Sequence, residues 1–171
     1  MKKILSVIAV LCIMLSFAVP ASAAGISVSL SGSTTVTADG SVTYTVNLSG
    51  AQKCTGGSVA ITVGDKLEVT SGEFLKDGSI LANFDLTKNK GAIAFKNEVD
   101  LNGGFFRFTA KAKEAAKDGQ AVSVTVTLAD GTSDSGSSTL KIICANHSYG
   151  SWAKVNDGSH KRTCSACGHE E

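Results

Sequence analysis

The chain has 171 residues, of which 43% are hydrophobic and 18% charged, and its 16 Lys+Arg nearly balance its 15 Asp+Glu. This length corresponds to one or at most two domains, and the high apolar content with a low net charge excludes an intrinsically disordered chain. Nucleic acid is also excluded as an expected partner, because phosphate binding requires a basic patch that the balanced charge does not supply.

Residues 1–23 have the organisation of a secretory signal peptide. Two lysines precede an apolar stretch over 4–19, and residues 21–23 read Ala-Ser-Ala, a small-residue cleavage site. We therefore expect a secreted protein, extracellular or at the cell surface, whose mature form keeps four of the five cysteines. No later apolar run approaches the roughly 20 residues of a transmembrane helix, so we expect no membrane span in the mature form.

The body of the chain, 24–143, alternates between apolar and polar residues in short runs, which is typical of half-buried antiparallel strands. These runs lie at 26–30, 42–48, 59–63, 67–69, 80–84, 92–95, 106–112, 122–128 and 140–143. Turn signals such as Asp39-Gly40 and Asp130-Gly131 separate them, and this arrangement predicts an all-β sandwich or barrel. Only Ala112–Lys117 is rich in helix formers, and Gly119 limits any helix there to about two turns.

The aromatic residues of the body divide between two predicted environments. Phe106 and Phe108 share a strand face with Ala110, which predicts that they are core residues. Phe105 falls on the opposite face of the same strand. The alternation therefore makes Phe105 the better candidate for an exposed contact, such as stacking on a sugar.

Segments of the body resemble the cohesin family. Residues 56–69 read GGSVAITVGDKLEV, which is similar to the family's Gly-rich turn, strand and short leucine-containing strand. Residues 103–112 read GGFFRFTAKA and are similar to a later strand of these modules, and 115–128 resembles the turn and strand that follow. Gly64 stands where the family has a tyrosine before the aspartate.

The resemblance spans about 26–143 and implies a jelly-roll β-sandwich of about nine strands, a fold shared with certain carbohydrate-binding modules. Cohesins are non-catalytic and bind dockerins, and in this way they array polysaccharide-degrading enzymes at a cell surface. The implied partner is therefore a dockerin-like protein module or a polysaccharide.

The tail, 144–171, holds the one group of residues with metal-binding chemistry. Cys144 and His147 are two residues apart, as are Cys164 and Cys167, and 16 residues lie between the pairs. Two chelating pairs at this separation are the spacing of a zinc ribbon, since a two-residue gap lets one turn present two ligands. We predict a structural zinc site with these four ligands, because a catalytic zinc would need an open position.

The tail is also similar to a Cys/His motif of extracellular proteins from anaerobic Gram-positive bacteria, in which His-x-Tyr-Gly-x-Trp precedes His-x-x-x-Cys-x-x-Cys-Gly. In that motif His160 is as plausible a ligand as Cys144. His169 is a further candidate, so the sequence leaves the ligand set open. Lys161 and Arg162 are placed to offset the net charge of about −1 that three thiolates and one imidazole leave around Zn²⁺.

Two other uses of the cysteines stay open at this point. Exported cysteines can form disulfides, and the pairs Cys164–Cys167 and Cys54–Cys144 are the alternatives to a metal site. A thiol-redox protein is the second possibility, with Cys164 and Cys167 as an extracellular electron-exchanging pair.

The positions of the histidines argue against an enzyme. All three lie in the tail, so a serine or cysteine nucleophile in the body lacks a base close in sequence. We expect a signal peptide (1–23), a cohesin-like sandwich (24–143) and a zinc-ribbon-like tail (144–171), whose abrupt end suggests truncation. The expected function is a secreted, non-catalytic binding or scaffolding module that engages a dockerin-type protein or a polysaccharide in extracellular polysaccharide degradation.

Overall fold

The structure is a computed structural model that describes residues 25–171. The expected signal peptide lies outside the described residues. Residues 25–171 contain strands and turns but no helix. This part of the chain therefore has no helix that could cross a membrane. The predicted all-β class is therefore confirmed for this part of the chain.

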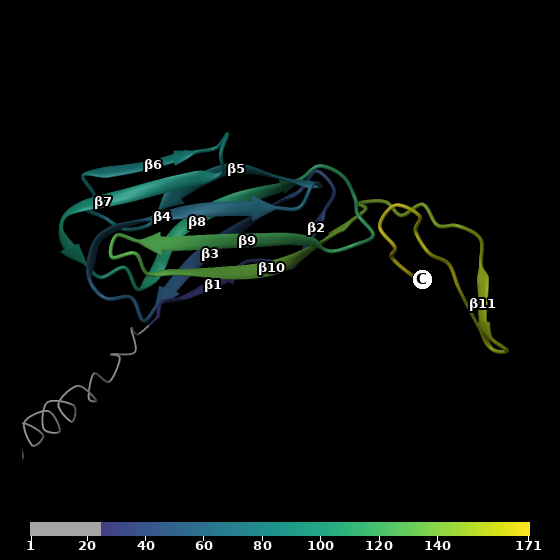
Figure 1. The fold of residues 1–171 in the computed structure, drawn as a ribbon. Helices are drawn as coiled ribbons and strands as arrows, with labels where there is room; N and C mark the ends of the chain where they lie inside the picture. Colours follow the sequence, from purple (N-terminus) through teal and green to yellow (C-terminus); the bar gives the residue numbers. More distant parts are fainter. Residues whose placement is uncertain (1–24) are drawn as a thin grey trace, which may run out of the picture.

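Two sheets pack against each other to form a sandwich (Figure 1). The four-stranded sheet has the order β1 (Ser27–Ser31), β3 (Ser41–Ser49), β8 (Gly103–Ala112) and β5 (Leu67–Phe74). The six-stranded sheet has the order β2 (Thr35–Thr37), β10 (Ser133–Ile143), β9 (Gln120–Leu128), β4 (Cys54–Val63), β7 (Lys90–Val99) and β6 (Leu81–Asp85). Neighbouring strands are antiparallel except for β2 and β10, which are parallel.

The core lies between the sheets and consists of the inward positions of the alternating runs. Tyr44 of β3 and Phe108 of β8 stack with ring centroids 5.3 Å apart, and the Tyr44 hydroxyl donates a hydrogen bond to the Ser33 carbonyl. From the other sheet, β9 contributes four buried side chains at alternate positions: Val122, Val124, Val126 and Leu128. Period-two alternation therefore positions most of the core.

A close approach between β1 and β10 joins the two sheets along one side. The Val28 N–H donates a hydrogen bond of 2.8 Å to the Asp134 carboxylate. Gly136 is buried opposite the same segment, and a Cβ at this position would lie only 2.8 Å from the Val28 carbonyl oxygen. Glycine at 136 therefore lets these strands approach each other closely.

The structure corrects the prediction for Phe105, which is fully buried rather than exposed. The register between β3 and β8 shifts at this point, because Val46 is opposite Phe106 while Asn47 is opposite Gly104. Phe105 is thus the extra residue of a β-bulge, which breaks the alternation of sides. Its ring turns inward and packs edge-on against Phe74, with centroids 5.4 Å apart.

The sandwich has ten strands, in agreement with the expected jelly roll of about nine, and its shortest strand is β2, whose three residues lie beside the end of β10. One further feature differs from expectation. The segment after Ala112 forms a loop rather than a short helix. Its Ala116 is buried and donates its N–H to the Ile142 carbonyl, so the backbone bonds to β10 instead of to itself.

Beyond β10 the chain forms a small separate sheet from β11 (Ala153–Asn156) and β12 (Ser159–Lys161). All residues of these two strands are exposed. Figure 1 shows this tail projecting past the end of the sandwich at which β10 finishes. A two-stranded hairpin with no covered face is marginal in water, so the tail must be stabilised by other contacts.

Candidate functional site

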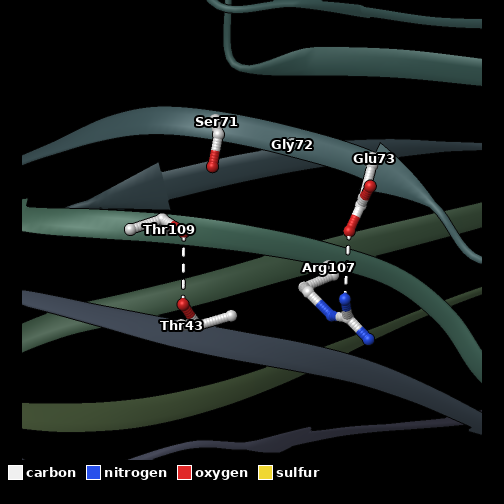
Figure 2. Close-up of a pocket in the computed structure, with 6 residues that line it drawn as sticks. All are labelled: Thr43, Ser71, Gly72, Glu73, Arg107 and Thr109. Carbon is white, nitrogen blue, oxygen red and sulfur yellow. Dashed lines mark hydrogen bonds and ion pairs between the residues drawn. The ribbon is translucent and has the colours of Figure 1, made fainter.

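The two outer faces of the sandwich have different chemistry. Outward positions of β9, of β10 up to Thr139, of β4 from Ser58 and of the middle of β7 carry only hydroxyl and methyl groups: Ser58, Ala60, Thr62, Ala92, Ala94, Ala121, Ser123, Thr125, Thr127, Ser133, Ser135, Ser137 and Thr139. We call this set the uncharged face. The outer face of the four-stranded sheet is instead hollowed and carries an ion pair between Glu73 and Arg107 (Figure 2).

Apolar side chains border the uncharged face at β6. Leu81 is 56% exposed and lies opposite Ala94, so it points to the same side of the sheet. Ile80, immediately before it, is 70% exposed. Charges lie at the ends of the strands: Asp85 of β6 is opposite Lys90 of β7, and exposed lysines follow at Lys96 of β7 and Lys141 of β10. The sequence analysis did not identify this face, although the unbroken Ser, Thr and Ala at alternate positions of 58–62, 121–127 and 133–139 could have indicated it.

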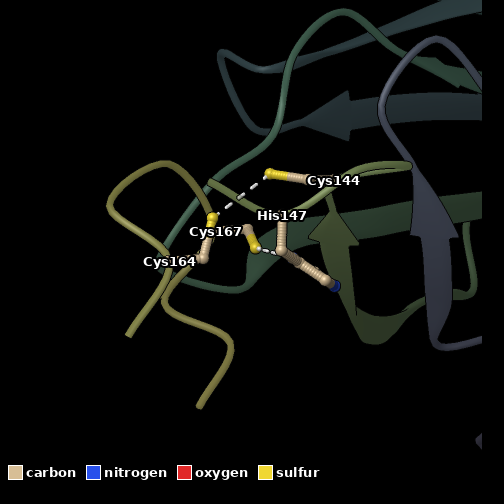
Figure 3. Close-up of side chains that lie close together, drawn as sticks. All are labelled: Cys144, His147, Cys164 and Cys167. Carbon is tan, nitrogen blue, oxygen red and sulfur yellow. Dashed lines mark hydrogen bonds between the residues drawn. The ribbon is translucent and has the colours of Figure 1, made fainter. Parts of the chain in front are cut away.

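The predicted metal ligands Cys144, His147, Cys164 and Cys167 come together in the tail (Figure 3). Their ligand atoms all lie within 4.8 Å of one another. Cys144 directly follows β10, and His147 is three residues further along the same segment. Cys164 and Cys167 lie on the turn that follows β12, so the hairpin brings the two halves of the cluster together.

The spacing of these atoms fits four-coordinate metal binding. A Zn–S bond of about 2.3 Å gives an edge of about 3.8 Å between two sulfurs of a tetrahedron. The Sγ atoms of Cys144 and Cys164 are 3.7 Å apart, and Sγ of Cys167 is 3.3 Å from Nδ1 of His147. Three thiols and one imidazole are also the donor types that zinc prefers. The cluster could therefore hold a metal ion with a closed coordination shell.

Backbone hydrogen bonds hold the second chelating pair in its turn. The Gly168 N–H donates to the Cys164 carbonyl over 2.9 Å, and the Cys164 N–H donates to the His169 carbonyl over 2.8 Å. Gly168 has a φ of 70°, in the left-handed region that glycine adopts without strain. The sequence Cys-x-x-Cys-Gly therefore forms a tight turn that directs both sulfurs to one side.

Hydrogen bonding within the cluster separates the acidities of the cysteines. A hydrogen bond from the Cys167 backbone N–H, followed in size by one from the His147 ring, lowers the pKa of Cys164 from 9.0 to about 5. Hydrogen bonding with Cys167, followed by burial, raises the pKa of Cys144 to about 12. Contact with Cys164 raises the pKa of His147 above its usual value. Hydrogen bonding thus lowers the pKa of Cys164 and raises that of Cys144.

The remaining cysteine and histidines lie outside the cluster. His160 is exposed on β12, opposite Lys154, so the structure places Cys144 rather than His160 with the other ligands. The His169 ring stacks on His147 at 4.4 Å between centroids. Cys54 is buried at the start of β4, and all four described cysteines are free thiols. The disulfide alternatives Cys164–Cys167 and Cys54–Cys144 are therefore absent from residues 25–171.

Charged and aromatic side chains beside the cluster form a second tail contact that the sequence analysis did not identify. The Arg162 guanidinium lies 4.7 Å from the Tyr149 ring centroid and 4.8 Å from that of Trp152. Arg162 also pairs with Glu171, and Lys161 pairs with Glu170. These two basic residues are thus neutralised by neighbouring carboxylates instead of being reserved for the thiolates.

Comparisons with known proteins agree with the fold. No family model and no curated protein matches the chain. Among solved structures, the fold is similar to a non-cellulosomal cohesin from the hyperthermophilic archaeon Archaeoglobus fulgidus, with a TM-score of 0.52 and 19% sequence identity. The match covers 70% of this chain and 92% of that cohesin. The likeness confirms the predicted cohesin-like jelly-roll sandwich.

Proposed function

We propose that the chain is a secreted, non-catalytic binding module that engages a dockerin-type protein partner, or a polysaccharide, in extracellular polysaccharide degradation. The observation that carries this proposal is the uncharged face of the six-stranded sheet. A cohesin-like fold supports a role in protein binding, and the signal-peptide pattern of 1–23 supports secretion. The signal peptide, the 24–143 sandwich and the 144–171 tail are the proposed units of the chain.

The uncharged face shares one property with the centre of a protein interface, which is its lack of charged side chains. Charged residues are depleted at interface cores, because each charge buried there must be desolvated and paired. One row of opposed residues across this sheet runs Asn83, Ala92, Ser58, Thr127 and Ser133. Short side chains make a flat surface, and exposed Leu81 and Ile80 at its margin supply apolar contact area.

Retention on immobilised ligands tests the proposal. The chain from Ala24 to Glu171 is passed over a panel of purified dockerin modules and over insoluble glycans. We expect saturable retention on one of these ligand classes. Lack of retention on both would contradict the proposal, and so would turnover of a polysaccharide by the purified chain.

We further propose that the tail binds one structural zinc ion through Cys144, His147, Cys164 and Cys167. Zinc would supply charge neutralisation and a fixed tetrahedral geometry, with all four positions taken by protein ligands. The role of the chain's own residues is to present these ligands from the end of β10 and from the turn after β12. The tail would then be held at the end of the sandwich.

The alternative is an extracellular thiol-redox protein that uses Cys164 and Cys167. The observation that favours it is the pKa of Cys164, which is lowered to about 5, because a thiolate is the reactive form. The burial of both side chains, 0% and 1% exposed, opposes it, since exchange requires access to a sulfur. One zinc per chain with these cysteines protected from alkylation would exclude the redox function, whereas reduction of insulin disulfides would support it.

A further inference from the structure

The outer face of the four-stranded sheet contains a hollow of about 470 Å³, opposite to the uncharged face. It lies over β3, β8 and β5, and we call it the hydroxyl groove. Its lining residues are Thr43, Ser71, Gly72, Glu73, Arg107 and Thr109. This volume falls within the range of small-molecule sites, which is about 300–1,000 Å³.

The floor of the hydroxyl groove is a row of three hydroxyl groups from three strands. Ser71 of β5 is opposite Thr109 of β8, which is opposite Thr43 of β3. The Thr43 and Thr109 hydroxyls form a hydrogen bond of 3.3 Å (Figure 2). Each hydroxyl can donate one hydrogen bond and accept two, so this single bond leaves most of the floor's capacity free.

An ion pair forms one wall of the groove. Nη1 of Arg107 is 3.1 Å from Oε1 of Glu73, and both side chains are about half exposed. This one contact leaves the other guanidinium donors and the second carboxylate oxygen facing the hollow or solvent. Because the two charges cancel, the wall offers donors and acceptors together without attracting a charged ligand.

The backbone of β5 explains why a hollow exists here. The register between β5 and β8 shifts after Val69, so that Ser71 rather than Thr70 is opposite Thr109. This bulge displaces β5 locally and directs the short Ser71 side chain toward the row of hydroxyl groups on the floor. In the next row, Glu68 is opposite Lys111, and these longer side chains border the floor on its other side.

We propose that the hydroxyl groove binds a neutral saccharide. Sugar hydroxyls both donate and accept hydrogen bonds, as do the groups of the floor, and vicinal hydroxyls suit the planar carboxylate and guanidinium groups of the wall. A peptide strand is a poorer match, because it pairs with the backbone at a sheet edge and this site is on a sheet face. The inference rests on the polysaccharide part of the proposed function and is independent of the uncharged face.

The lining also determines how tightly such a ligand binds. No aromatic ring lines the groove, so stacking energy is absent and binding depends on hydrogen bonds, each of which contributes little in net terms. We therefore expect a Kd on the order of 1 mM for an oligosaccharide. Removing the Glu73 charge by Glu73→Gln should weaken binding about tenfold, because a hydrogen bond to a charged group is stronger than a neutral one.

A titration followed by amide chemical shifts tests the inference. The chain from Ala24 to Glu171 is titrated with xylohexaose, mannohexaose or cellotetraose, to about twenty times the expected Kd. We expect saturable shifts with one of these at 41–45, 69–73 and 107–111. The shifts should weaken in Glu73→Gln and in Thr109→Val, but remain unchanged in Thr37→Val, a matched control at an exposed threonine of β2 that belongs neither to the groove nor to the uncharged face.

Three results would overturn the inference. These are no saturable shift with any of the three neutral probes, shifts confined to β4, β7 and β9, or binding of hexagalacturonate, a negatively charged oligosaccharide, with the same affinity as a neutral probe. A different result would contradict the proposed protein-binding function, namely that no dockerin module retains the chain although the saccharide still shifts the amides of the groove. Retention on a dockerin module without any groove shifts would overturn the saccharide inference alone.

Discussion

Removal of the metal should unfold the tail and leave the sandwich intact. Only two tail residues, Cys164 and Cys167, are fully buried, and both are proposed ligands. The strands β11 and β12 are exposed on both faces. The sandwich, in contrast, has its own core between two sheets and none of the four ligands within it.

The magnitudes support this separation. The tail has three ion pairs, Lys154–Asp157, Lys161–Glu170 and Arg162–Glu171, each worth at most about 1 kcal/mol at an exposed site. Its two cation–π contacts add about 1 kcal/mol each. A structural zinc site contributes about 10–16 kcal/mol in small zinc-binding peptides, which exceeds all of these contacts together. Metal binding should therefore supply most of the free energy that folds the tail.

Amide spectra with and without a chelator provide the assay, together with metal content. In the metal-free chain we expect the amides of 144–171 to lose their dispersion while those of 25–143 keep theirs. The fluorescence of Trp152, the only tryptophan, should change as its contact with Arg162 is lost. His147→Ala should lose the metal, whereas His160→Ala, the matched control, should retain one ion per chain. A tail that stays folded without metal, or an equal loss of metal in His147→Ala and His160→Ala, would show that the proposed zinc site does not fold the tail.

Three further predictions concern protons and packing. Zinc binding at pH 7 should release protons, because a cysteine thiol with its ordinary pKa of 9.0 is protonated at this pH and must ionise to bind the metal. Calorimetry in buffers of different ionisation enthalpy measures this release, and no buffer dependence would contradict it. Hydrogen bonds from Thr87, followed by Lys88, lower the pKa of Asp85 from 3.8 to about 2. The turn therefore adds stability that is fully present above pH 3.8 and is lost as the pH falls through 2. Thr87→Val should raise the pKa of Asp85 in a carboxyl NMR titration, and an unchanged value would argue against the contact. Phe106→Ala should lower the free energy of unfolding of the sandwich by about 3–5 kcal/mol in denaturant unfolding, because the buried Phe106 ring packs on three other rings. A decrease below about 1 kcal/mol would be inconsistent with this core.

Alternation predicted the fold because the strands are amphipathic and long enough to show a period of two. It failed at Phe105, since a β-bulge depends on how β8 pairs with β3, and pairing is not visible within one strand. It also missed β2, which has three residues and is stabilised by its parallel pairing with β10. The hairpin strands β11 and β12 have no buried face, so they leave no apolar pattern to detect.

Spacing predicted the candidate metal ligands, because chelating pairs are a local property of the chain. It could not choose between Cys144 and His160, since that choice depends on the path of the chain between the pairs. His160 belongs to the outgoing hairpin and lies opposite Lys154, whereas Cys144 is fixed by the end of β10. The uncharged face and the hydroxyl groove require the order of strands in each sheet, which the sequence pattern alone does not contain.

If the uncharged face binds a protein partner, a charge placed in its centre must weaken that binding, and an affinity measurement with two matched arginine variants tests this most directly. Binding of the chain to purified dockerin modules is measured for the native sequence, for Thr125→Arg in the centre of that surface, and for Ser29→Arg on the other sheet. We predict that Thr125→Arg weakens binding by about 100-fold or more, because an unpaired charge would be buried, while Ser29→Arg leaves Kd unchanged. Equal affinities for all three proteins, or a loss caused by Ser29→Arg alone, would contradict the account.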